Sequence, residues 1–82
     1  MVTVAFGEHF QKIFSKIKDN SLKEKIIKQI GKLKINPEAG KPMRFNRKGT
    51  REIYVSPFRL SYAYLENEDK IVILDFYHKD KQ

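Results

Sequence analysis

The side chains of this sequence best suited to chemistry on phosphate are its arginines. All four lie within sixteen positions, as Arg44, Arg47, Arg51 and Arg59, whereas the lysines are scattered along the whole sequence. A guanidinium group is a planar fork that binds a phosphate at two points, and its charge survives burial. Because the surrounding residues favour strands, we expect a sheet surface that binds a polyanion.

The charge distribution supports this expectation. The formal net charge of +7 favours an acidic partner such as nucleic acid or an acidic protein segment. Residues 41–51 carry five basic side chains and no acidic one, whereas Glu66, Glu68 and Asp69 gather in a predicted turn. A uniformly solvated lysine surface is the alternative, and the uneven distribution of charge argues against it.

The length and composition predict one small soluble domain. A chain of 82 residues is long enough for a single core. Cysteine is absent, which excludes disulfides and thiolate zinc sites and agrees with a reducing cytoplasm. The sequence has no apolar run of membrane-spanning length and no signal-peptide pattern, so we expect a cytoplasmic protein without a membrane partner.

The first half of the sequence predicts one strand followed by two helices. Residues 2–6 are β-branched and apolar, as is typical of a strand. Apolar residues then recur at helical spacing from Glu8, as Phe10, Ile13, Phe14 and Ile17. Ser21 and Glu24 have the spacing of a capping box that begins a second helix. The apolar face of that helix is predicted to hold Leu22, Ile26, Ile27, Ile30 and Leu33.

The second half predicts a sheet. Residues 36–42 read as a loop, and strands are expected over residues 51–56, 58–65 and 70–77, with a bulge or bend at Pro57 and a hairpin turn at 66–69. The order β-α-α-β-β-β predicts an α+β fold, with a helical hairpin packed on one face of a twisted, mainly antiparallel sheet.

Alternation along residues 58–65 assigns the two faces of the central strand. Phe58, Leu60, Tyr62 and Tyr64 should meet the helices, whereas Arg59, Ser61 and Ala63 should lie on the face without helices. Arg59 would then lie beside small side chains that leave room for a ligand. We expect a groove on this face to be the functional site.

In this order the sequence resembles the RelE/ParE superfamily of bacterial and archaeal toxins, and within it the RelE-like branch that cleaves messenger RNA. The resemblance covers nearly the whole chain. It rests on the asparagine-proline-glycine loop at residues 36–42, on Arg51-Glu52-Ile53, on the aromatic-Arg-apolar-x-Tyr element at residues 58–62, and on residues 73–79.

The resemblance implies an activity and partners. RelE-like members are mRNA interferases: they enter the ribosomal A site and cut mRNA by metal-independent attack of a ribose 2′-hydroxyl on the adjacent phosphorus. The implied partners are the ribosome, mRNA and a RelB-like antitoxin that wraps around the toxin in a heterotetramer or another hetero-oligomer. The chemistry requires no cofactor, and the sequence has no cluster of metal ligands.

The resemblance also implies residue roles. Arg59 matches the central-strand arginine that stabilises the scissile phosphate, with an ion pair to Glu52 or Asp75 as the structural alternative. Lys79 stands where the family has an arginine that protonates the leaving group. His78 is the other candidate for that proton transfer, because imidazole side chains transfer protons near neutral pH. The alternative is that His78 simply ends the strand in solvent.

Further roles concern the basic segment. Arg51 matches a basic position that assists at the 2′-hydroxyl, and Lys48 is the alternative there. Arg44 and Arg47 are expected to position the RNA backbone, and Phe45 either stacks on a base or is buried. A tyrosine that stacks on the substrate follows the last strand in RelE-type chains, and the residues after Tyr77 include none.

Two other classes of function stay open. ParE-like members share the scaffold but inhibit DNA gyrase without cleaving RNA, so the fold alone does not decide the activity. A catalytically weak module that only binds RNA or the antitoxin is the third possibility, and the lack of a tyrosine after the last strand keeps it open.

Overall fold

The computed structural model describes residues 2–42 and 49–81. The elements are β1 (Thr3–Phe6), α1 (Glu8–Lys16), α2 (Asn20–Ile35), β2 (Lys41–Pro42), β3 (Thr50–Val55), β4 (Phe58–Leu65) and β5 (Lys70–His78). Two short 3-10 helices, η2 (Glu66–Glu68) and η3 (Lys79–Lys81), precede and follow β5. Within the described ranges, no helix is long and apolar enough to cross a membrane.

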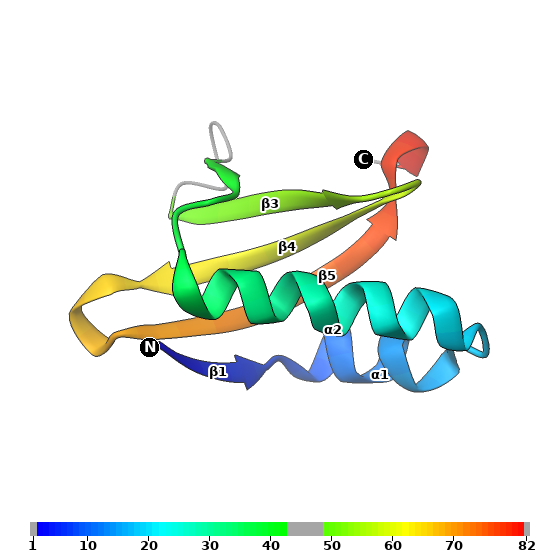
Figure 1. Ribbon diagram of the computed structural model, residues 1–82, viewed down its shortest axis with the longest axis horizontal. Helices are drawn as coiled ribbons and strands as arrows, with labels where there is room; N and C mark the ends of the chain where they lie inside the picture. The colour runs from blue at the N-terminus through cyan, green and yellow to red at the C-terminus, as the bar shows by residue number, and fades with distance from the viewer. Residues whose placement is uncertain (1, 43–48, 82) are drawn as a thin grey trace.

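The strands form one mixed sheet in the order β1-β5-β4-β3-β2. The edge strand β1 runs parallel to β5, and the other three neighbouring pairs are antiparallel. Both helices pack on one face of the twisted sheet (Figure 1). The predicted α+β fold, with a helical pair on one face of a mainly antiparallel sheet, is confirmed.

The core lies between the helices and this face of the sheet. The helices contribute Phe10, Ile26, Ile30 and Leu33, and the strands contribute Val55, Leu60, Tyr62, Ile71, Ile73 and Phe76. Leu60 and Tyr62 are fully buried, which confirms the predicted inward face of the central strand. The predicted burial of Ile27 is wrong, since this residue is 60% exposed.

The start of α2 differs from the predicted capping box. Asp19, not Ser21, is the N-cap, and its carboxylate accepts hydrogen bonds from the backbone N–H groups of Ser21 and Leu22 at 2.9 and 3.3 Å. An aspartate before the helix satisfies the first free N–H groups, and its negative charge is favourable at the positive helix end. Ser21 is therefore a residue of the first turn.

Two connections differ from the sequence prediction in ways that affect the site. Val55 pairs with Phe58, so Ser56 and Pro57 form a two-residue turn, which agrees with the predicted bend and excludes the predicted bulge. The predicted loop at 36–42 ends in the short strand β2, whose Lys41 pairs with Glu52 of β3. The two-residue turn and the pairing of β2 with β3 determine which side chains lie on the same face of the sheet.

Candidate active site

The face of the sheet without helices carries Arg59. In antiparallel strands, directly paired residues lie on the same face and successive residues alternate between faces. Arg59 pairs with Tyr54 of β3 on one side and with Tyr77 of β5 on the other. Glu52 lies on the same face, two positions before Tyr54. The four side chains therefore come together from three strands.

Glu52 connects Arg59 and Tyr77. Its Oε1 accepts a hydrogen bond from Nη1 of Arg59, and its Oε2 accepts one from the hydroxyl of Tyr77, each at 2.5 Å. The Glu52 side chain is 9% exposed and that of Arg59 is 34% exposed. The ion pair foreseen as the structural alternative for Arg59 is thus present, and it leaves part of the guanidinium accessible from the pocket.

A pocket of about 470 Å³ opens over this cluster. Cationic and acidic residues from four elements line it together with two apolar residues and a tyrosine: Ala39, Lys41, Glu52, Ile53, Tyr54, Arg59 and Lys79. Three of these side chains are cationic and one is anionic, so the pocket has an excess of positive charge. This arrangement suits a phosphate group.

Tyr54 lies within this pocket and is 51% exposed. A hydrogen bond with the Ser56 side chain is the largest influence that lowers the pKa of its phenol below the usual value. Burial is the second-largest influence and opposes this shift, while the charge of Lys79, a hydrogen bond with Lys79 and the charge of Arg59 lower the pKa further. Each of these contacts favours the phenolate.

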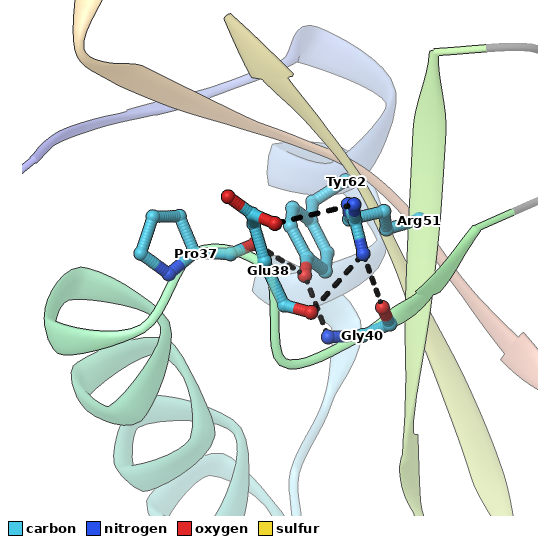
Figure 2. Close-up of polar contacts among 5 residues, drawn as sticks. All are labelled: Pro37, Glu38, Gly40, Arg51 and Tyr62. Carbon is cyan, nitrogen blue, oxygen red and sulfur yellow. Dashed lines mark hydrogen bonds and ion pairs between the residues drawn. The ribbon is translucent and has the colours of Figure 1, made fainter. Parts of the chain in front are cut away.

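Arg51 lies on the opposite face of the sheet from Arg59. It pairs with Tyr62 of the core, and its Nη1 donates to the carbonyls of Glu38 and Gly40 at 3.0 and 2.8 Å (Figure 2). Its Nη2 also lies 3.9 Å from the Glu38 carboxylate. The structure therefore does not bring Arg51 together with Arg59, and its contacts attach the loop after α2 to the sheet.

Tyr62 completes this attachment from the core side. Its hydroxyl donates to the carbonyl of Pro37 at 2.7 Å and accepts from the N–H of Gly40 at 2.9 Å (Figure 2). A Cβ at position 40 would lie 2.7 Å from that hydroxyl and 2.8 Å from the Glu52 carbonyl. The close approach explains why glycine stands there, and it places Lys41 beside the pocket.

The two candidates for protonating the leaving group, His78 and Lys79, are consecutive residues at and just after the end of β5 but lie on different faces of the sheet. Lys79 lines the pocket with Arg59. His78 pairs with Phe58 on the helix-covered face, where their ring centroids are 5.5 Å apart. Its Nδ1 accepts from the N–H of Asp80 at 3.2 Å. Of these two residues, the structure places only Lys79 near Arg59.

The remaining predicted residues, Arg44, Phe45, Arg47 and Lys48, lie outside the described residues. Sequence reasoning missed Lys41, Glu52 and Tyr54 as members of the site. A two-residue turn at Ser56 and Pro57 would have placed Tyr54 opposite Arg59, so the signal for this residue was present. In residues 2–42 and 49–81, no group of three His, Cys, Asp or Glu residues has the arrangement of a metal site.

The fold and this cationic pocket define a small α+β protein with a site suited to an anion, and sequence comparison identifies the family. The family model described as the ParE toxin of type II toxin–antitoxin systems matches residues 1–82. The chain therefore belongs to this toxin family, within the RelE/ParE superfamily. No curated protein sequence matches the chain significantly.

Solved structures share the fold of this chain. A chain of the toxin–antitoxin complex RelBE2 from Mycobacterium tuberculosis is 26% identical, with a TM-score of 0.82 over 95% of this chain and 98% of that one. The isolated RelE toxin of E. coli is 17% identical, with a TM-score of 0.82 over 100% and 88% of the two chains. A YoeB/ParE toxin from Agrobacterium tumefaciens is 15% identical, with a TM-score of 0.83 over 94% and 98%.

Proposed function

We propose that this toxin is an endoribonuclease that cleaves mRNA in the ribosomal A site, by attack of a ribose 2′-hydroxyl on the adjacent phosphorus. The observation that carries the proposal is the shared pocket of Arg59 and Lys79 on the face without helices. Such a reaction needs cations where negative charge develops on the phosphorane and a proton donor for the departing 5′-oxygen.

Each cation has a distinct role in this proposal. The accessible part of the Arg59 guanidinium binds the non-bridging oxygens of the scissile phosphate, while Glu52 holds the group in place. Lys79 donates a proton to the 5′-oxygen, for which an ammonium is suited because it has three donors. Lys41 adds a third positive charge to the pocket.

The experiment that tests the proposal maps the 5′ ends of transcripts after induction of the toxin without its antitoxin. Cuts within codons that require ribosomes are expected for the wild type and absent for Arg59→Ala. A matched control is Arg51→Met, which removes a guanidinium from the other face. Cuts that persist in Arg59→Ala would refute the assignment of the site.

A gyrase inhibitor is the second candidate, favoured by the match to the ParE toxin model. It would leave messages intact and produce DNA breaks, and its effect would not depend on Arg59. Measuring DNA breaks in the same induced cultures therefore separates the two functions. A module that binds RNA without cleaving it would give neither outcome.

We also propose that a cognate antitoxin neutralises this toxin, as implied for a family member whose relative RelBE2 was solved as a toxin–antitoxin complex. An apolar groove of about 750 Å³ lies between the helices and β1, and its lining includes Phe6, Phe14, Ile27 and Ile30. Phe6 and Ile27 are 47% and 60% exposed, and Lys34 borders the groove. An amphipathic, acidic segment of the antitoxin fits this combination.

A further inference from the structure

The proposed cleavage needs a group that takes the proton from the 2′-hydroxyl. The following inference rests on the proposed function and names this group. Arg51, which sequence reasoning placed there, lies on the other face of the sheet. Arg59 and Lys79 already have roles in the proposed cleavage. Among the other described residues that line the pocket, three have side chains that can exchange a proton: Lys41, Glu52 and Tyr54.

Two of these three are poorly suited to the task. Both carboxylate oxygens of Glu52 already accept hydrogen bonds, from Arg59 and Tyr77, and the residue is only 8% exposed. Proton acceptance by Glu52 would weaken its hold on Arg59 at the moment when the phosphorane needs that cation. Lys41 is an ammonium with donors and no free lone pair.

Tyr54 differs from both in its position. It stands directly opposite Arg59 across β3 and β4, and it shares the pocket with Lys79. With 51% of its surface exposed, it is accessible to a ribose whose phosphate lies on Arg59. We propose that the phenolate of Tyr54 is the general base that accepts the proton of the attacking 2′-hydroxyl.

The surroundings of Tyr54 favour the ionised form. The Ser56 side chain lowers the pKa of the phenol most, burial opposes this, and Lys79 and Arg59 lower the pKa further, so that the net shift is downward. Of the other charged residues that line the pocket, Lys41 also favours an anion and Glu52 opposes it, although Arg59 compensates the charge of Glu52. A larger fraction of Tyr54 is therefore ionised near neutral pH than for an ordinary tyrosine.

The step balances without any further reactant. The 2′-hydroxyl proton moves to the Tyr54 phenolate while the 2′-oxygen forms a bond to phosphorus. The bond from phosphorus to the 5′-oxygen breaks, and that oxygen takes its electron pair and a proton from the Lys79 ammonium. The products are a 2′,3′-cyclic phosphate and a 5′-hydroxyl. Tyr54 then returns its proton to the neutral amine of Lys79, its hydrogen-bonding neighbour, which restores both groups.

The first test is single-turnover cleavage on ribosomes programmed with a defined mRNA, using the full-length toxin. Tyr54→Phe keeps the ring and removes the hydroxyl, so binding to an mRNA with a 2′-deoxyribose at the cut site should be unchanged. Cleavage should fall by about 10²–10⁴-fold, the usual contribution of a general base. The wild-type rate should rise with pH as the phenol ionises, and Tyr54→Phe should lose this rise.

A second substrate separates the base from the acid. Sulfur in place of the 5′-oxygen leaves as a thiolate and needs no proton, so it should restore cleavage by Lys79→Met. The same substrate should leave Tyr54→Phe slow, because the 2′-hydroxyl must still lose its proton. A purely structural role for Tyr54 predicts a different result, in which the rate falls without any change in the pH profile.

The outcomes distinguish this inference from the proposed function. If the wild type cleaves and Tyr54→Phe cleaves equally fast, or is restored by the sulfur substrate, the role of Tyr54 is refuted and the nuclease stands. A wild-type rise that lies in the pH range of a carboxylate, together with loss of activity and of this rise in Glu52→Gln, would assign the base to Glu52 and refute the role of Tyr54. If the wild type leaves every message intact, the proposed function falls, and the role of Tyr54 falls with it.

Discussion

The carboxylate of Glu52 and the guanidinium of Arg59 lie 2.5 Å apart on the face of the sheet that carries no helix. The second oxygen of Glu52 accepts from Tyr77, so strands β3, β4 and β5 are joined by one carboxylate. This contact fixes the direction of the guanidinium and occupies only one side of it. An ion pair at Arg59 is therefore compatible with a role for the same residue in phosphate binding.

Replacing Glu52 by alanine should destabilise the fold and disturb the site. The change leaves Arg59 and Tyr77 without this acceptor, at a cost of about 2 kcal/mol because hydrogen bonds to charged groups are involved. For a domain of this size, that corresponds to a melting temperature lower by roughly 10 °C. Tyr77→Phe, which loses one hydrogen bond to Glu52, should show about half the effect. Equal melting temperatures for Glu52→Ala and wild type would contradict the bracing role.

Arg51 should matter for stability and not for cleavage. Arg51→Met removes the hydrogen bonds to the Glu38 and Gly40 carbonyls, and we expect a loss of about 1–3 kcal/mol in the free energy of unfolding. Cleavage per folded molecule should stay at the wild-type level, since the side chain lies on the other face. A loss of cleavage as complete as that in Arg59→Ala would return Arg51 to the site.

A matched pair of glycine substitutions tests the loop that precedes Lys41. In Gly40→Ala the new methyl group would meet the Tyr62 hydroxyl at 2.7 Å and the Glu52 carbonyl at 2.8 Å, which should cost about 1–3 kcal/mol. In Gly31→Ala the methyl group meets nothing within 4 Å, and the better helix propensity should stabilise α2 by about 1 kcal/mol. Urea unfolding of both variants measures the difference, and shifts of the same sign would be unexpected.

Sequence reasoning reached the fold and the position of Arg59 because both depend on local patterns. Alternation along β4 is enough to place Arg59 on the face of the sheet that does not carry Leu60 and Tyr62. The face of Arg51 depends instead on the register between β3 and β4, which the two-residue turn at Ser56 and Pro57 sets. With Pro57 interpreted as a bulge or bend, neither Tyr54 nor Glu52 was assigned to the site.

The cap of α2 was missed for a different reason. Asp19 and Ser21 both have side chains that cap helices, and a sequence pattern does not fix which of them stands just outside the first turn. The hydrogen bonds of the Asp19 carboxylate to two backbone N–H groups decide this in the folded chain. The exposure of Ile27 likewise depends on how the two helices pack together.

Alkaline pH should unfold the protein partly through Tyr62. Burial is the largest cause that raises the pKa of its phenol, whereas the unfolded chain ionises near the usual value of about 10. The unfolded state therefore loses its proton first, so the contribution to stability is complete below pH about 10 and is lost as the pH rises through the folded pKa. Tyr62→Phe should be less stable at pH 7 and should show a weaker decline between pH 9.5 and 11, roughly the window around that value. An unchanged decline would mean that other groups control alkaline unfolding.

Antitoxin binding should depend on the apolar groove beside β1. Ile27→Glu puts a charge among Phe14, Ile30 and their neighbours, where an apolar side chain of the partner would otherwise be buried. Losing the burial of one such side chain costs about 1.5–3 kcal/mol, which is roughly a 10- to 150-fold weaker affinity for the cognate antitoxin. Ile35→Glu is the control, because Ile35 is 78% exposed and lies outside the groove lining. Calorimetric titration of the antitoxin into each variant measures the difference, and equal weakening by both substitutions would place the contact elsewhere.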